Sequence, residues 1–135
     1  MSLKIKSKIQ VVPLVITNGS SAATRPFNPT MLADYKRVRG FYVIRNSGSS
    51  YLEISIKDGS GNAIVEPVNI THLTCTNSIA IKDRFYRDSP FEANGKQLAI
   101  TIQNFATLSA DENIDLILEL DNESEEHEEH HRNQN

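Results

Sequence analysis

The chain holds one cysteine, Cys75, three residues after His72, and a thiol beside an imidazole is the pairing that nucleophilic enzymes use. The surrounding segment is predicted to be a strand, on which positions three apart point to opposite faces. His72 would then be unable to act as the base for Cys75. Cysteine is also among the residue types most often buried. We therefore expect a core or half-buried cysteine, no catalytic residues and no enzyme.

The other histidines lie in an acidic C-terminal segment, residues 122–135, which contains no apolar residue. If that segment were helical, His127 and His131 would lie one turn apart and could hold a divalent transition metal. With Glu128 they match the histidine spacing and the glutamate of a zinc-protease helix. Such a helix must be buried beside a substrate cleft, and this segment lacks the apolar residues to dock there. A solvated charged tail without a metal site is the favoured interpretation.

The run from Asp58 to Asn62 superficially resembles a calcium-binding loop. It lacks the third alternating acid and the distant bidentate glutamate of an EF-hand. Because alternating segments flank it, the run is predicted to be a hairpin turn. The sequence also contains no glycine-rich phosphate loop and no dinucleotide fingerprint, so no cofactor is expected.

Basic and aromatic residues cluster at residues 35–45 and 82–87. Guanidinium groups beside rings can bind phosphates and stack on bases. The whole chain is acidic, however, with a net charge of −3, so nucleic acid is not the expected partner. The other use of these cations is to meet carboxylates of a neighbouring subunit or of the acidic tail. The interface candidates are Lys36, Arg37, Arg39, Arg45, Arg84 and Arg87.

Charge divides the chain into two parts of opposite sign. Residues 1–100 carry 13 Lys and Arg against seven Asp and Glu, whereas residues 101–135 carry one Arg against ten acids. We predict one domain over residues 1–121 and an acidic, histidine-containing tail over residues 122–135. A domain of this size needs no disulfide or metal to fold, and a single cysteine excludes an internal disulfide. No run approaches 18 apolar residues, so no membrane span is expected.

Alternation of apolar and polar residues dominates the body and predicts strands. It is clearest at residues 98–103 and 114–120, where every second residue is leucine or isoleucine. Further short strands are expected at residues 41–45, 51–57, 63–65, 69–75 and 78–82. Residues 18–29 are predicted to be a loop, and residues 30–37 a helical turn. About eight short strands separated by turns predict an all-β protein, an antiparallel, jelly-roll-like β-sandwich.

The first and last predicted strands carry complementary patterns. Residues 3–11 place lysines 4, 6 and 8 on one face and apolar residues, among them Ile9 and Val11, on the other. Residues 113–121 place Asp115 and Glu119 opposite a row of leucine and isoleucine. Antiparallel pairing of the two, within one chain or between chains, would bury both apolar rows and set lysines against acids. The run that follows, residues 12–16, contains a proline, which predicts an edge strand or a bulge.

The run of strands from Gly40 to Asn104, together with the charged ends, resembles small phage capsid proteins of the jelly-roll kind, such as penton or capsid-decorating subunits. The resemblance implies a non-enzymatic structural protein of the virion, assembled in the host cytoplasm as a homo-oligomer or with other protein subunits. The alternative is a carbohydrate- or receptor-binding β-sandwich module. Because the chain has no Trp, Tyr42, Tyr51 and Tyr86 would have to supply its aromatic surface.

Overall fold

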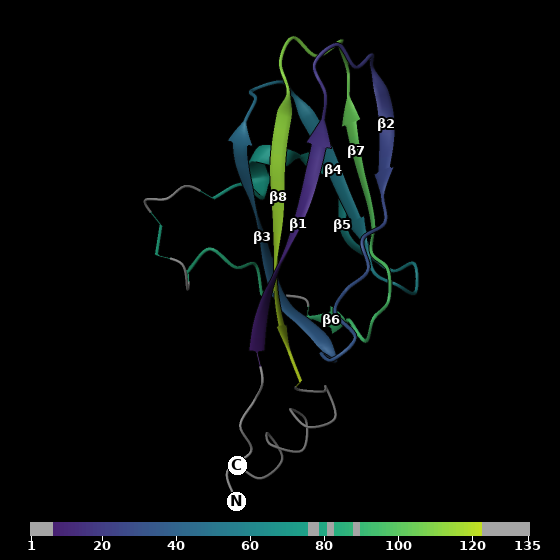
Figure 1. The fold of residues 1–135 in the computed structure, drawn as a ribbon, viewed down its shortest axis with the longest axis vertical. Coiled ribbons are helices and arrows are strands. Elements are labelled where there is room, and N and C mark those ends of the chain that lie inside the picture. Colours follow the sequence, from purple (N-terminus) through teal and green to yellow (C-terminus); the bar gives the residue numbers. More distant parts are fainter. Residues whose placement is uncertain (1–6, 76–78, 81–82, 88–89, 123–135) are drawn as a thin grey trace, which may run out of the picture.

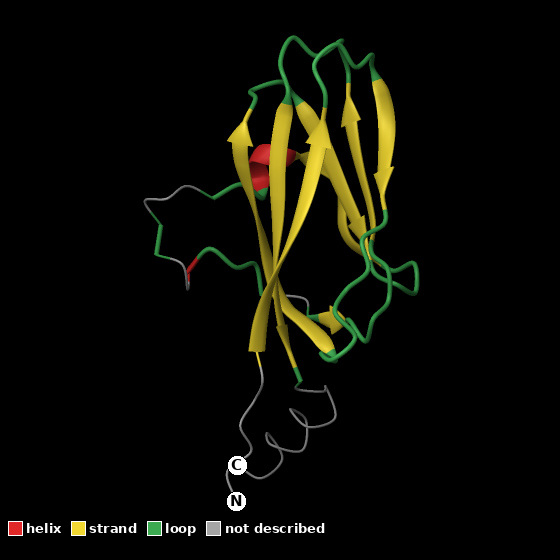
Figure 2. Ribbon diagram, viewed as in Figure 1, coloured by secondary structure: helices red, strands yellow, loops and turns green. Residues whose placement is uncertain are grey.

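The computed structural model describes residues 7–75, 79–80, 83–87 and 90–122. These residues form two four-stranded sheets packed face to face, with little helix (Figures 1 and 2). The elements are β1 (Ser7–Ile16), β2 (Ala23–Phe27), β3 (Arg37–Ser47), β4 (Leu52–Lys57), β5 (Ala63–Asn69), the 3-10 helix η1 (Ile70–His72), β6 (Phe91–Glu92), β7 (Ala99–Asn104) and β8 (Glu112–Asp121). No helix in the described ranges is long and apolar enough to cross a membrane.

The strands are nested in antiparallel pairs. Sheet A has the order β1-β8-β3-β6, and sheet B has the order β2-β7-β4-β5. Each strand therefore pairs with the strand at the mirrored position in the chain: β1 with β8, β2 with β7, β3 with β6, and β4 with β5. This nesting across two sheets is the jelly-roll arrangement, which confirms the predicted all-β sandwich. The predicted ladder between the first and last strands is also confirmed, and it forms within one chain.

The core lies between the inner faces of the two sheets, where alternate residues of each strand meet. The fully buried apolar residues of β4, β7 and β8 are Leu52, Ile54, Ile56, Ile100, Ile102, Ile114, Leu116, Leu118 and Leu120. The alternation predicted for these strands is thus confirmed. Burial of each such side chain contributes about 1.5–3 kcal/mol, so these rows are a large part of what stabilises the sandwich.

The orientation of β1 differs from the prediction. Ile9 and Val11 were expected in the core, but they are 47% and 54% exposed. Val12 and Leu14 are buried instead. Residues 11–16 are apolar at both odd and even positions, so the alternation by itself cannot select the inner face. The buried row of β8 selects it, because it faces the even-numbered residues of β1 across the ladder.

The expected opposition of lysines and acids is consequently wrong for Lys8. That residue pairs with Leu120, whereas Glu119 pairs with Ile9. Lys4 and Lys6 lie outside the described residues. The proline prediction is confirmed, because Pro13 lies on β1, and β1 is an edge strand of sheet A. A proline is tolerated at an edge since no neighbouring strand requires its missing N–H.

Two further segments fold differently from the prediction. Residues 18–29 were expected to be a loop but contain β2, which pairs with β7 and accommodates Pro26 because β2 is an edge strand. Residues 30–37 form no helix and only one turn, in which the Tyr35 N–H donates to the Leu32 carbonyl at 3.4 Å. The Met31 N–H donates instead to the Lys96 carbonyl of a distant loop at 2.9 Å.

The strand predicted for residues 69–75 is η1 followed by an isolated bridge at Thr74. The cause is local, because the Asn69 side chain accepts a hydrogen bond from the Thr71 N–H and caps the helix. Of the strand predicted for residues 78–82, the two described residues, 79 and 80, are not in a strand, and the others lie outside the described residues. The hairpin turn predicted at Asp58 is confirmed, since its carboxylate accepts two backbone N–H bonds at 2.9 Å.

Candidate binding surfaces

Arg37, at the start of the first basic cluster, binds a carboxylate of β8 in the same chain. Its Nε lies 2.7 Å from Asp121 Oδ1, and its Nη2 lies 3.2 Å from Oδ2. The two side chains are 6% and 2% exposed. A two-point contact between a guanidinium and a carboxylate is the strongest geometry of ion pair. Arg37 is therefore an internal link between β3 and the end of β8.

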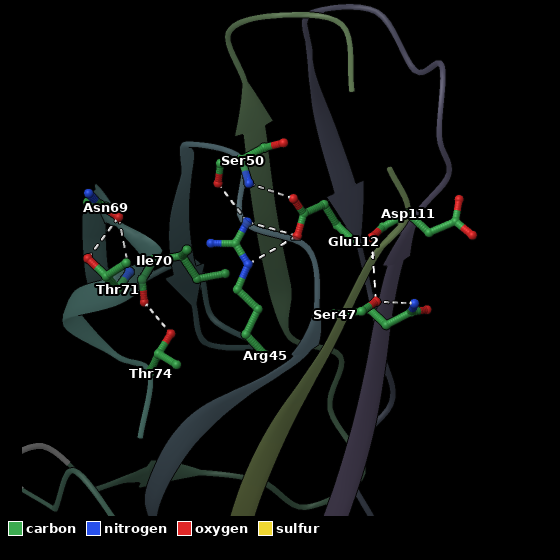
Figure 3. Close-up of polar contacts among 10 residues, drawn as sticks. Arg45, Ser47, Ser50, Asn69, Ile70, Thr71, Thr74, Asp111 and Glu112 are labelled. Carbon is green, nitrogen blue, oxygen red and sulfur yellow. Dashed lines mark hydrogen bonds and ion pairs between the residues drawn. The ribbon is translucent and has the colours of Figure 1, made fainter. Parts of the chain in front are cut away.

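A second buried ion pair closes the opposite end of sheet A (Figure 3). Arg45 Nη2 lies 2.8 Å from Glu112 Oε2, and the Glu112 side chain has no exposed surface. The Ser50 N–H donates to the other carboxylate oxygen at 2.9 Å, and Arg45 donates to the Ser50 carbonyl at 2.6 Å. Gly48 passes over the carboxylate with φ +99°, where a Cβ would lie 1.8 Å from Oε2. The loop between β3 and β4 therefore packs around the Glu112 carboxylate and bonds to it.

Glu119, on the outer face of sheet A, binds two arginines unequally. Arg87 forms a two-point contact with it, at 2.9 Å for each bond, and this hydrogen bonding raises the pKa of the Arg87 guanidinium. Arg39 is farther away, with its Nε 3.9 Å from the carboxylate, and its side chain is 52% exposed. Gly40 allows the closer contact, because a Cβ there would lie 2.6 Å from Arg87 Cγ.

The six interface candidates therefore fall into distinct environments. Arg37 is buried and Arg45 is partly buried, and each binds a buried carboxylate of its own chain. Arg84 donates to the Ile79 carbonyl at 2.8 Å. Lys36 is exposed, and its backbone N–H donates to the Asp121 carbonyl, so it lies where β8 ends. Of this set, Lys36 and Arg39 are the two exposed residues.

Cys75 and His72 line the same depression beside β3, a hollow of about 230 Å³ that includes Phe85 and Tyr86 in its wall. The prediction that they face opposite sides of a strand is wrong, because His72 ends η1 and no strand joins the two residues. Cys75 is half-buried, as predicted, and its Sγ donates to the Arg84 carbonyl at 3.4 Å.

Of the three tyrosines expected to form an aromatic surface, two are exposed. Tyr42 is 8% exposed and packs edge-on against Phe85. Tyr86 is 45% exposed and contacts the buried Phe41 ring. Tyr51 is 54% exposed and pairs with another exposed ring, that of Phe105, which the sequence reasoning did not include. The signal was present, because Phe105 continues the outward phase of the alternation in β7.

The outer face of sheet A carries a row of exposed apolar side chains along β1. Ile9, Val11 and Val15 are 47%, 54% and 51% exposed. Val11 is the register partner of Ile117, which is 7% exposed on the same outer face, and Ile117 in turn is opposite Tyr42 on β3. We call Ile9, Val11 and Val15 the β1 row. Because the alternation placed Ile9 and Val11 on the inner face and gave no orientation for residues 12–16, sequence reasoning missed this surface.

The described residues include no group of three or more histidine, cysteine, aspartate or glutamate side chains arranged to hold a metal ion. The metal-binding alternative considered for His127 and His131 lies outside the described residues. Searches of protein-family models and of curated protein sequences found no match to this chain.

Proposed function

We propose that the chain is a non-enzymatic structural subunit of a larger protein assembly, a virion capsid subunit that associates with copies of itself. The observation that carries the proposal is the β1 row on the outer face of sheet A. Contiguous exposed apolar side chains on a soluble domain are typical of protein–protein contacts. Jelly rolls form viral capsid and lectin domains, so the fold is compatible with the proposal but does not establish it.

The β1 row is also self-complementary. Its outward positions are Ile9, Val11, Pro13 and Val15, which are placed symmetrically about Val12. A two-fold axis at Val12 would set Ile9 of one copy against Val15 of the other. Closed two-fold contacts of this kind are the commonest in homo-oligomers. Because Pro13 has no N–H to donate, the two β1 edges could not form a complete ladder of backbone hydrogen bonds. Side-chain packing would therefore contribute more to the contact than backbone hydrogen bonds would.

The test is the mass of the full chain by size-exclusion chromatography with light scattering. We expect a mass above the 15.1 kDa of one chain at about 1 mM protein, and a shift towards the monomer in Val11→Lys. Thr24→Lys is the matched control, because Thr24 is exposed on edge strand β2 of sheet B. A monomeric wild-type chain, or equal dissociation of both variants, would contradict the proposal.

A further inference from the structure

Tyr51 and Phe105 form an exposed aromatic pair at one end of sheet B. Tyr51 directly precedes β4 and Phe105 directly follows β7, two strands that are neighbours in the sheet. Their side chains are 54% and 49% exposed, with ring centroids 5.5 Å apart and ring planes inclined by 52°. Since Leu52 and Asn104 point inward, the two rings lie on the outer face of sheet B, on the side of the molecule opposite the β1 row.

Polar side chains continue from these rings across the same face. Glu53 and Gln103 are opposite each other on β4 and β7, and Thr24 of β2 is opposite Gln103 on the other side. The Tyr51 hydroxyl donates to Glu53 at 2.8 Å, which raises the pKa of the tyrosine. The Gln103 amide makes no side-chain hydrogen bond within the described residues, so its donors and its acceptor remain available to a ligand.

The backbone beneath the pair is held in place by a buried side chain. Asn104 is 1% exposed, and its amide donates to the carbonyls of Ser20, Ser21 and Ala106 at 3.0–3.3 Å. These bonds tie the loop from β1 to β2 to the residues on either side of Phe105. The ring is therefore presented by a rigid scaffold, and little ordering entropy would be lost when a ligand contacts it.

We propose that the surface formed by Tyr51, Phe105, Glu53, Gln103 and Thr24 binds a neutral oligosaccharide. The C–H faces of a pyranose ring are apolar and pack on aromatic rings, while its hydroxyls both donate and accept hydrogen bonds. Glu53 supplies hydrogen-bond acceptors, and the Gln103 amide supplies both donors and an acceptor. Thr24 supplies a hydroxyl. The two inclined rings suit consecutive sugars that are rotated relative to each other. A nucleic acid fits less well, because Glu53 would repel its phosphates.

The test is an NMR titration of the full chain, following backbone amides, with cellohexaose, maltohexaose and chitohexaose, each to about 10 mM. We expect at least one of them to shift the amides of residues 51–53 and 103–105. Tyr51→Ala should then weaken its binding at least about tenfold. Gln103→Ala should weaken it by a smaller factor, and it leaves the internal hydrogen bonds of the described residues intact. Tyr86→Ala is the matched control, because Tyr86 is another exposed tyrosine, and it should bind as the wild type does.

Three results would overturn the inference. One is the absence of shifts at these amides with all three sugars. Another is an equal loss of binding in Tyr51→Ala and Tyr86→Ala. The third is a shift of the same amides by a thymidine hexanucleotide in place of the sugars. This test is independent of the test of the assembly proposal. The titration reports on amides of sheet B, whereas the mass measurement reports on association through the β1 row of sheet A.

Discussion

The Glu112 side chain has no exposed surface, so its carboxylate needs hydrogen-bond partners within the protein. They come from β3 and from the loop between β3 and β4. Arg45 neutralises its charge, and the Ser50 N–H occupies its second oxygen. Among the described residues, every buried side-chain nitrogen or oxygen has such a partner. A buried charge is tolerated only when its hydrogen bonds are complete, so the loss of one partner affects the whole end of the sandwich.

Arg45→Ala should therefore destabilise the domain by about 3–5 kcal/mol, because it leaves the Glu112 carboxylate buried without its counter-ion. Urea unfolding followed by circular dichroism measures the change. Lys96→Ala is the control, since Lys96 and Glu92 form an ion pair whose side chains are 40% and 50% exposed. Exposed pairs contribute about 0–1 kcal/mol. Similar losses in the two variants would show that the buried pair has no special role.

The sequence predicted that the arginine clusters would meet carboxylates, but it did not predict which ones. Arg37 is separated from Asp121, and Arg45 from Glu112, by most of the domain in sequence. Their proximity depends on β8 lying beside β3 and on the register between them. Neither follows from residue types, so the sequence analysis expected carboxylates of a neighbouring subunit or of the acidic tail, and the carboxylates of β8 that Arg37 and Arg45 bind correct that expectation.

At the scale of the strand, the local sequence pattern was sufficient to predict which face points into the core for β4, β7 and β8. It was not sufficient for β1. In the first three, one parity carries an unbroken apolar row and the other is polar except at Ala99 and Ile117, so the inner face follows directly from the alternation. In β1 both parities are apolar from Val11 to Ile16. The short β2 was missed because its composition, with a proline and polar residues, is that of a loop. Its strand conformation depends on the β7 edge that it joins.

Two adjacent residues of β1 test its orientation. Leu14→Ala should lower the free energy of unfolding by about 2–5 kcal/mol, because Leu14 is fully buried and its truncation leaves a cavity. Val15→Ala should change it by only about 0.5 kcal/mol, since Val15 is 51% exposed. The comparison is made by urea unfolding at low protein concentration, where association does not contribute. The reverse order would mean that the outward and inward faces of β1 have been exchanged.

At the scale of the whole molecule, the two outer faces of the sandwich differ in character. The outer face of sheet A carries the β1 row, and the outer face of sheet B carries a polar row beside one aromatic pair. The alternation pattern predicted that a sandwich would form. It could not assign a role to either face, because a role depends on which side chains from different strands become neighbours.

Lys36 and Arg39 affect the molecule as a whole, because both are exposed near the end of sheet A where β8 stops, with the Arg39 guanidinium 3.9 Å from the Glu119 carboxylate. Reversal of either charge, Lys36→Glu or Arg39→Glu, should weaken association and make it less sensitive to salt, since exposed charges are screened beyond about 10 Å at 0.1 M salt. Sedimentation velocity at low and high salt measures this. Lys57→Glu, on the outer face of sheet B, makes the same charge change and should have no effect.

The position of β8 between β1 and β3 has a consequence for synthesis in the cell. The strands of sheet B have all been translated by Asn104, whereas β1 has no partner until Asp121 has been added. At about 5–20 residues per second, synthesis from Ile16 to Asp121 takes about 5–21 s. Throughout that time the nascent chain carries the apolar residues of β1 on both sides of an unpaired strand. Chaperones that bind chains emerging from the ribosome would therefore encounter β1 while it is unpaired, and would have to release it when β8 arrives.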